Sequence, residues 1–225
     1  MQLKTIATIK TGFSEKFGIP RQSGMVEDTA EIVFEPEFRN PDAVRGLEGF
    51  SHIWLIWQFS ESMRRGWSPT VRPPRLGGNT KMGVFATRSP FRPNELGLSS
   101  VKLLGIEFNK QKGPVLYVSG ADLLDGTPIF DIKPYLPFTD SHADAKFGFA
   151  EGYKEYKLSV DFDENLKQKI DEETVLAIEQ ILAADPRPSY QNDPKRVYGL
   201  KFYDYEIKFS VDGNKLKVLE ATKLL

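Results

Sequence analysis

The 225-residue sequence contains no cysteine and only two histidines, His52 and His142. The lack of cysteine excludes disulfide bonds, thiolate metal ligands and a cysteine nucleophile. With so few histidines, a zinc site of the usual kind would have to depend on carboxylates, so we expect no metal centre. Any chemistry that the protein performs must therefore use other side chains or an organic cofactor.

The sequence also lacks the common signatures of nucleotide-binding and hydrolytic enzymes. It contains no G-x-G-x-x-G segment, no Walker loop and no G-x-S-x-G elbow. No segment approaches the roughly 20 consecutive apolar residues that a membrane helix needs, and the first residues are strand-like rather than typical of a signal peptide. We therefore expect a cytoplasmic protein without membrane association, in which a cofactor is held by another kind of site.

Positive charge is concentrated in one segment, from Ser62 to Asn94. This segment holds seven of the 30 basic residues and none of the 31 acidic residues, although the formal net charge of the chain is -1. Such segregation usually has an anionic partner: phosphate, carboxylate or nucleic acid. Prolines and apolar residues such as Trp67 and Phe85 are interleaved with the charges, which indicates an ordered loop. A solvated loop with scattered arginines is the alternative.

The pattern of short apolar segments predicts a mainly β fold in two parts. Residues 1–148 contain many short strand candidates punctuated by glycine and proline, which is typical of a barrel or sandwich. These candidates are 30–34, 53–57, 81–87, 98–108, 115–121 and 128–133. The continuously apolar segment Ile53–Trp57 suits a strand buried on both faces. Gly105 lies where the apolar parity of 98–108 switches, as a β-bulge requires.

Residues 151–225 are predicted to form a small α+β unit. Alternating apolar residues indicate its strands, and apolar residues at helical spacing indicate its helix. The elements are expected as a strand at 156–162, a helix at 164–183 that is interrupted near Asp171, and a hairpin of 197–211 with 215–220. A unit of about seventy residues is marginal alone, so we expect it to dock on the first part.

Three short motifs can carry chemistry. Phe85–Asn94 combines two arginines, hydroxyls and an amide, which suits a phosphate or carboxylate; a turn with capping hydroxyls is the alternative. Asp122–Pro128 begins an acidic region whose carboxylates can hold an amine or ribose hydroxyls, although Asp125-Gly126 is also a turn pair. Asp185–Tyr190 has alternating prolines that fit a contact arm, or simply a helix stop.

Five segments in this order together resemble the TsaA-like family. They are residues 44–52, 72–78, 83–94, 125–137 and 185–190. The likeness spans nearly the whole chain. Bacterial members are tRNA methyltransferases that use S-adenosylmethionine to methylate N6 of the threonylcarbamoyl-modified adenosine beside the anticodon. The resemblance therefore implies a β-barrel N-terminal domain with a small α+β C-terminal domain, a homodimer, and the anticodon stem-loop of tRNA as partner.

The resemblance also implies a cofactor site, carried over motif by motif. Its residues would be Pro20, Arg21, Gln22, Ser60, Glu61, Arg88, Leu98, Asp122, Leu123, Leu124 and Asp125. The family often has His-Gln in place of Ser60-Glu61, so only a backbone contact is carried over there. Acidic groups such as Asp122 and Asp125 can bind the ammonium or ribose of the cofactor, and Arg88 can pair with its carboxylate.

The implied reaction suggests two further sets of residues. The acceptor nitrogen carries a proton that a base would help remove, and the candidates are Asp125, Asp131 and His52. Basic and aromatic side chains would position the RNA, and the predicted contacts are Arg64, Arg65, Arg72, Arg75, Arg92, Arg187 and Tyr190. Two other functions stay open: a non-enzymatic RNA-binding barrel, and an enzyme acting on a phosphorylated or carboxylated metabolite.

Overall fold

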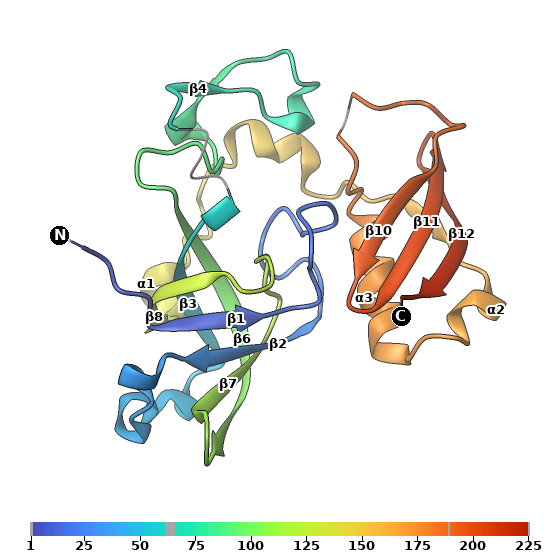
Figure 1. The fold of residues 1–225 in the computed structure, drawn as a ribbon. Coiled ribbons are helices and arrows are strands. Elements are labelled where there is room, and N and C mark those ends of the chain that lie inside the picture. Colours follow the sequence, from blue (N-terminus) through green and yellow to red (C-terminus); the bar gives the residue numbers. More distant parts are fainter. Residues whose placement is uncertain (1, 62–65, 189, 225) are drawn as a thin grey trace.

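The computed structural model describes residues 2–61, 66–188 and 190–224. A closed barrel of six strands forms the N-terminal part, in the order β1-β2-β7-β6-β3-β8 (Figure 1). Its strands are β1 (Ala7–Lys10), β2 (Thr29–Phe34), β3 (His52–Gln58), β6 (Leu96–Asn109), β7 (Gly113–Ser119) and β8 (Pro128–Pro134). All neighbouring strands are antiparallel. The predicted mainly β fold with a barrel is confirmed.

The interior of the barrel is filled by apolar side chains. Alternate residues of β3, namely Ile53, Leu55 and Trp57, are buried there together with residues such as Ile9 and Leu116. Six strands enclose an interior that side chains can fill completely. The prediction that β3 is buried on both faces is wrong, because its intervening residues lie on the outer surface and are only partly covered.

Strand β6 bends around the barrel and joins its two halves. Residues up to Lys102 pair with β3, and residues from Lys102 onward pair with β7. The register shifts between Leu103 and Gly105, so the predicted bulge at Gly105 is confirmed. An extra residue in one strand lets it bend and twist more strongly, and here it allows one long strand to serve both neighbours.

The basic segment rises from the barrel as a long excursion between β3 and β6, coloured teal at the top of Figure 1. It contains a small ladder of β4 (Thr70–Val71) with β5 (Met82–Gly83). The expected strand at 81–87 is wrong beyond Gly83, because the chain turns there into the 3-10 helix η6 (Val84–Ala86). Arg92 stabilises this turn, since its Nη1 donates to the carbonyl oxygens of Val84 and Thr87, at 3.2 and 2.7 Å.

Several short helices connect the barrel strands and lead out of the barrel. They are η1 (Pro36–Phe38), η2 (Pro41–Val44), η3 (Leu47–Gly49), η5 (Pro74–Leu76), α1 (Pro137–Asp140) and η7 (Gly148–Tyr153). Four of them, η1, η2, η5 and α1, begin on a proline, whose fixed φ suits the first helical position. No helix in the described ranges is both long enough and apolar enough to span a bilayer.

The C-terminal part is a four-stranded sheet with two helices. Its strands have the order β10-β11-β12-β9, with β9 parallel to β12. The elements are β9 (Ser159–Asp161), α2 (Glu164–Lys167), α3 (Glu172–Ala183), β10 (Tyr198–Phe202), β11 (Tyr205–Asp212) and β12 (Lys215–Lys223). The predicted helix interruption near Asp171 is confirmed, because this side chain caps α3 by accepting from the Thr174 N–H.

Two of the expected C-terminal strands differ from those observed. The expected strand at 156–162 is shorter, and the expected strand at 197–211 is two strands joined by a turn at Tyr203. Tyr203 adopts a positive φ of 48°, a conformation that is uncommon for residues other than glycine. The buried residues fall at even positions in β10 and at odd positions in β11, so a parity switch marks the turn, and the prediction of one strand over 197–211 overlooked it.

The segment between β1 and β2 holds the two parts together. Phe13 and Val26 belong to the apolar core of the C-terminal part, and the ring of Phe13 lies 5.1 Å from that of Phe202. The Tyr203 hydroxyl donates to Asp28 over 3.0 Å. This segment appears in Figure 1 as the blue loop that reaches toward β10 and α3. The C-terminal part therefore docks on the first, as expected.

Candidate functional site

A cavity of about 950 Å³ lies on the outside of the barrel. Its floor is the outer face of β3 and β6, where Trp54 is paired with Ser100 and Gln58 with Leu96. Its walls come from residues 16–23, 59–61, 87–92 and 122–124. The alternation that buries Ile53 and Leu55 in the barrel thus turns His52, Trp54 and Gln58 toward this cavity.

A chain of hydrogen bonds runs from the barrel core to the cavity. The Trp57 Nε1–H donates to Ser99 Oγ over 2.9 Å, and Ser99 Oγ donates to Asp122 Oδ1 over 2.5 Å. Burial raises the pKa of Asp122, while the Ser99 hydrogen bond and the charge of Arg88 oppose this shift. The Arg88 guanidinium donates to the side-chain oxygen of Gln22. The cavity therefore presents a carboxylate and a guanidinium in fixed positions.

Aromatic side chains form another part of the cavity wall. The Trp54 ring lies 5.4 Å from that of Tyr135, and the His52 ring lies 6.2 Å from Tyr135. The Trp54 Nε1–H donates to Asp140 Oδ2 over 2.8 Å. The backbone N–H of Leu136 and the Trp54 N–H both lower the pKa of Asp140. Flat aromatic faces of this kind suit a stacked nucleobase.

Sequence reasoning missed Trp54 as part of a site, and it placed Tyr135 and Asp140 at the end of the acidic region without giving either an individual role. Tyr135 and Asp140 lie after β8 and in α1, at the start of the linker to the C-terminal part. Trp54 shares the outer face of β3 with His52, which was predicted. A strict period of two across β3 would have placed Trp54 beside His52, but the unbroken apolar run concealed this period.

Most of the predicted cofactor residues come together in the cavity. The lining includes Pro20, Arg21, Gln22, Ser60, Glu61, Arg88, Leu98, Asp122 and Leu124. Leu123 is instead fully buried in the barrel core. Asp125 is exposed and outside the lining, and its carboxylate accepts from the Thr11 N–H over 3.0 Å. The chain direction at 122–125 thus turns only alternate residues toward the cavity.

The three predicted bases lie in different places. His52 lines the cavity, and its Nδ1 is 3.0 Å from Ser51 Oγ. Asp131 forms an ion pair with Lys133 at 3.0 Å and, like Asp125, is not part of the lining. His52 is therefore the candidate base that the fold brings to the cavity.

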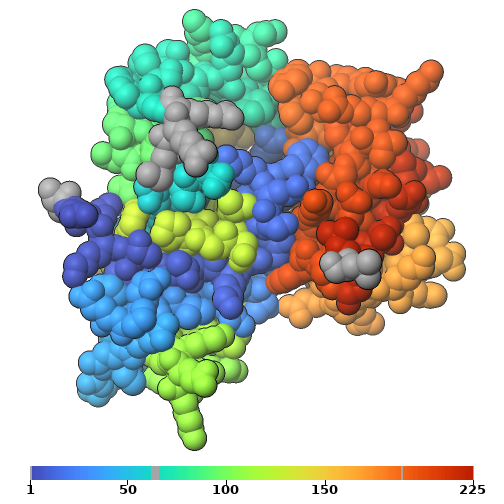
Figure 2. Space-filling model, in the orientation of Figure 1, coloured from blue at the N-terminus to red at the C-terminus, as the bar shows by residue number. Residues whose placement is uncertain are grey.

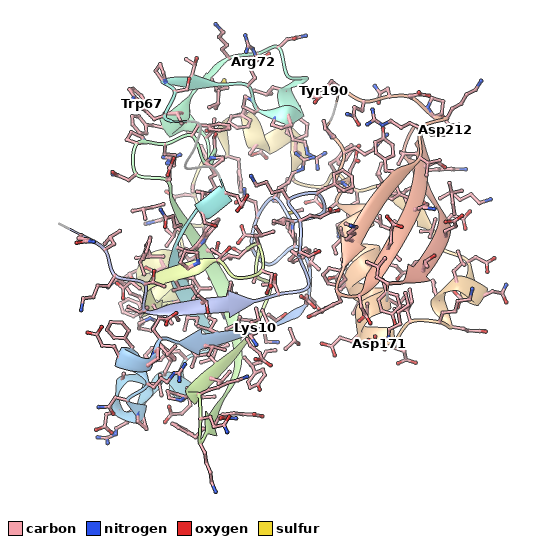
Figure 3. All side chains as sticks on the ribbon, viewed as in Figure 1. Lys10, Trp67, Arg72, Asp171, Tyr190 and Asp212 are labelled. Carbon is pink, nitrogen blue, oxygen red and sulfur yellow. The ribbon has the colours of Figure 1, made fainter. Side chains whose placement is uncertain are left out.

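The predicted RNA contacts fall into groups. Arg64 and Arg65 lie outside the described residues. Arg72 and Tyr190 are exposed, and Figure 3 shows Arg72 on the basic excursion and Tyr190 where this excursion approaches the C-terminal part. Arg92 lines the cavity while it braces the turn at η6. Of these predicted contacts, Arg92 reaches the cavity, whereas Arg72 and Tyr190 are exposed outside its lining.

Arg75 and Arg187 are used inside the protein. The Arg75 guanidinium lies 4.4 Å from the Tyr156 ring centroid and donates to the Ala184 carbonyl over 3.0 Å. Arg187 is only 5% exposed and pairs with Asp185 at 2.9 Å. The expectation that Arg187 contacts RNA is therefore corrected, because its guanidinium is buried and already paired. The spacing of Asp185 and Arg187, two residues apart, was a signal for such a local pair.

The basic excursion and the C-terminal part touch each other beside the cavity. Figure 2 shows them in contact at the top of the molecule, and the Arg75 hydrogen bond to Ala184 crosses this boundary.

Among the described residues, no group of three His, Asp or Glu side chains is arranged as a metal site would require. The site thus consists of a carboxylate, guanidinium groups and aromatic rings from several loops.

Comparison with known proteins agrees with both parts of the fold. Residues 8–141 match the family model of the tRNA-methyltransferase O N-terminal domain, and residues 155–224 match that of the TrmO C-terminal domain. The tRNA (adenine(37)-N6)-methyltransferase of Escherichia coli (strain K12) is 40% identical over 219 residues, which cover 93% of each chain. The putative S-adenosylmethionine-dependent methyltransferase RcsF of Pseudomonas aeruginosa is 41% identical over 213 residues, covering 90% of this chain and 89% of that one.

The fold also matches a solved structure over its whole length. The crystal structure of TrmO from P. aeruginosa has a TM-score of 0.79 and 34% sequence identity to this chain. The match covers 99% of this chain and 97% of the other. The similarity therefore includes both the barrel and the C-terminal part.

Proposed function

This chain belongs to the tRNA-methyltransferase O family, the TsaA-like family that its motifs resemble, and we propose that it methylates N6 of adenine 37 in tRNA with S-adenosylmethionine. We further propose that this adenosine carries a threonylcarbamoyl group, as the sequence resemblance implies. The observation that carries the proposal is the cavity, which joins Asp122 and Arg88 to an aromatic wall at the base of a basic loop.

The residues present fit S-adenosylmethionine. The cofactor has a cationic ammonium group and a carboxylate, and the cavity offers a half-buried carboxylate at Asp122 and a guanidinium at Arg88. Its volume of about 950 Å³ falls at the upper end of the range for small-molecule sites. S-adenosylmethionine supplies an electrophilic methyl group, and transfer of that group leaves a neutral thioether.

The protein's own part in the reaction is to position the adenine and to accept a proton. Trp54 and Tyr135 provide aromatic faces on which the base can stack. We propose that His52 accepts the N6 proton as the new nitrogen–carbon bond forms.

The basic excursion is suited to hold the anticodon stem-loop. Arg88 and Arg92 line the cavity, and Arg72 is exposed on the same segment. Phosphate contacts there would fix the RNA while its splayed base enters the cavity. A tRNA substrate agrees with the cytoplasmic location that the sequence predicts.

We also propose that the protein forms a homodimer. Leu98 is 56% exposed beside the cavity and offers an apolar surface that a partner can cover. Light scattering after gel filtration would test this oligomeric state.

A methylation assay tests the proposal directly. Purified protein, S-adenosylmethionine and a tRNA carrying threonylcarbamoyl-adenosine are expected to give the N6-methylated nucleoside, detected by mass spectrometry after digestion. The same tRNA without the threonylcarbamoyl group serves as the control and is expected to react poorly. Binding of tRNA without any cofactor affinity in calorimetry would favour the non-enzymatic RNA-binding barrel. Absence of methylation on both RNAs would favour an enzyme of small metabolites.

A further inference from the structure

A second, smaller recess adjoins the main cavity at the junction of the two parts of the fold. Its volume is about 280 Å³, and it shares Lys16, Ile19, Pro20 and Arg21 with the main cavity. The end of α3 and the arm around Tyr190 form its other side. This volume lies below the range of sites that hold whole small molecules, so the recess suits a substituent of a ligand that occupies the main cavity.

Arg21, which lines this recess, has one donor without a partner. Its Nη2 donates to the carbonyl oxygens of Asp185 and Arg187, at 3.1 and 2.9 Å. Its Nε is buried and has no hydrogen-bond partner among the described residues. Leaving a buried donor unsatisfied is unfavourable. Burial and the nearby charge of Arg75 also lower the pKa of Arg21, and the charge of Asp185 opposes this shift only in part.

The recess has an excess of positive charge. Lys16 Nζ donates to the neutral carbonyl oxygen of Glu61 over 3.0 Å. Asp185 is the carboxylate of the recess, but Arg187 and the Tyr156 hydroxyl already bind its oxygens. Among the described residues that line the recess, no carboxylate is therefore left to pair with Lys16 or Arg21. An anionic group from a ligand would complete the site.

We propose that Lys16 and Arg21 bind the carboxylate of the threonyl group on the substrate adenosine, an assignment that rests on the function proposed above. The adenine against Trp54 and Tyr135 would extend its N6 substituent along the cavity toward Lys16 and Arg21. An arginine and a lysine together match a carboxylate by charge and by donor geometry. The recess would then distinguish adenosine that carries the amino acid from unmodified adenosine.

The test compares two RNAs and two variants. The RNAs are anticodon stem-loops with threonylcarbamoyl-adenosine, one with a free carboxylate and one with its methyl ester. Because a hydrogen bond to a charged group contributes about 1.5–3 kcal/mol, the ester should lower kcat/KM for the unaltered protein about 10- to 150-fold. Lys16→Met should lower kcat/KM on the free acid and reduce the ester's penalty to about threefold or less. Lys16 is exposed, so this change should not impair folding.

Lys10→Met is the matched control, because Lys10 is exposed on the barrel, well separated from Tyr190 in Figure 3. It should keep the full ester penalty. The carboxylate bound by Lys16 could come from the threonyl group of the RNA or from the cofactor, and calorimetry with S-adenosylmethionine separates the two. If it comes from the RNA, Lys16→Met should leave the cofactor Kd unchanged. A tenfold weaker cofactor, or an undiminished ester penalty in Lys16→Met, would overturn the assignment. Equal rates on both RNAs would refute carboxylate binding at the recess but not the proposed function. No methylation of either RNA would refute the proposed function as well.

Discussion

Asp28 shows how one buried carboxyl group connects the two parts of the fold. Its side chain is 5% exposed and accepts from the Tyr203 hydroxyl. Burial raises its pKa from the ordinary 3.8 to about 6, and the hydrogen bonds from Tyr203 and from the backbone oppose this shift. Ionisation of Asp28 therefore places a negative charge inside the joint, where hydrogen bonds compensate its lost hydration only in part.

This pKa predicts a pH-dependent stability. Between the unfolded value of 3.8 and the folded value of about 6, the folded state keeps a proton that the unfolded state has released, so stability falls as pH rises through this window. Asp28→Asn removes this dependence. The difference in unfolding free energy between the two proteins should change by about 2 kcal/mol between pH 4.5 and 7.5, measured by urea titration. Asp144→Asn, at an exposed aspartate, is the control, and a pH-independent difference for Asp28→Asn would contradict the prediction.

Asp122 is expected to hold a cationic group of the cofactor. Asp122→Asn keeps the size of the side chain and removes its charge, so the Kd for S-adenosylmethionine should rise about tenfold or more, as for loss of one charge-assisted hydrogen bond. Isothermal calorimetry measures this change. Asp131→Asn, whose carboxylate lies outside the cavity lining and pairs with Lys133, is the matched control. Equal affinities for both variants would remove Asp122 from the cofactor site.

His52 is expected to act in the chemical step. His52→Gln preserves a polar side chain on β3 but lacks a basic nitrogen, so kcat should fall about 100-fold or more while the cofactor Kd stays the same. Single-turnover methylation measures the step itself. Ser51→Ala, which removes the hydroxyl beside Nδ1, should have a much smaller effect. A variant with an unaltered single-turnover rate would show that another group accepts the proton.

At the scale of elements, sequence patterns predicted where strands lie better than which way their side chains point. The five apolar residues of Ile53–Trp57 identified β3, yet apolarity on both faces gave no sign that Trp54 lines a cavity. The parity switch at Gly105 did predict the bulge in β6, because a bulge leaves its mark in the local pattern. The turn at Tyr203 also leaves a parity switch, from even positions in β10 to odd positions in β11, but the prediction of one strand over 197–211 overlooked it.

The basic excursion is predicted to act through its net charge on RNA phosphates. Arg72 and Lys81 are exposed on it, so replacing both with Ala should weaken tRNA binding at low salt. The slope of log Kd against log salt should decrease by roughly 0.7–0.9 for each lost phosphate contact. Filter binding at several salt concentrations measures this slope. Lys215→Ala with Lys217→Ala, on the C-terminal sheet, removes the same charge elsewhere, and an identical slope in both pairs would contradict the role of the excursion.

At the scale of the whole molecule, two apolar cores share one connecting segment. Phe13 comes from the N-terminal part of the chain but is buried, at 1% exposure, in the C-terminal core. The sequence predicted that the C-terminal unit would dock, because such a small unit has a limited core. It did not predict Phe13, Arg21 or Arg75 as the docking residues, since their partners lie far along the chain and no local pattern records such contacts.

This shared core predicts that the two parts stabilise each other. Phe13→Ala should lower the unfolding free energy by about 3–5 kcal/mol, as for other large core truncations. Denaturant unfolding followed by circular dichroism measures the change. Phe138→Ala removes the same ring from a position that is 83% exposed, so it should cost little. Similar losses in the two variants would show that Phe13 does not anchor the joint.

The cavity is built on the outside of a barrel whose interior is packed solid with side chains. Reactants can therefore enter and products can leave without movement of the barrel strands, so a rigid barrel does not slow turnover. Exposed lining residues such as Leu98 can also be substituted during evolution with little loss of stability, so substrate preference can change while the barrel fold is kept.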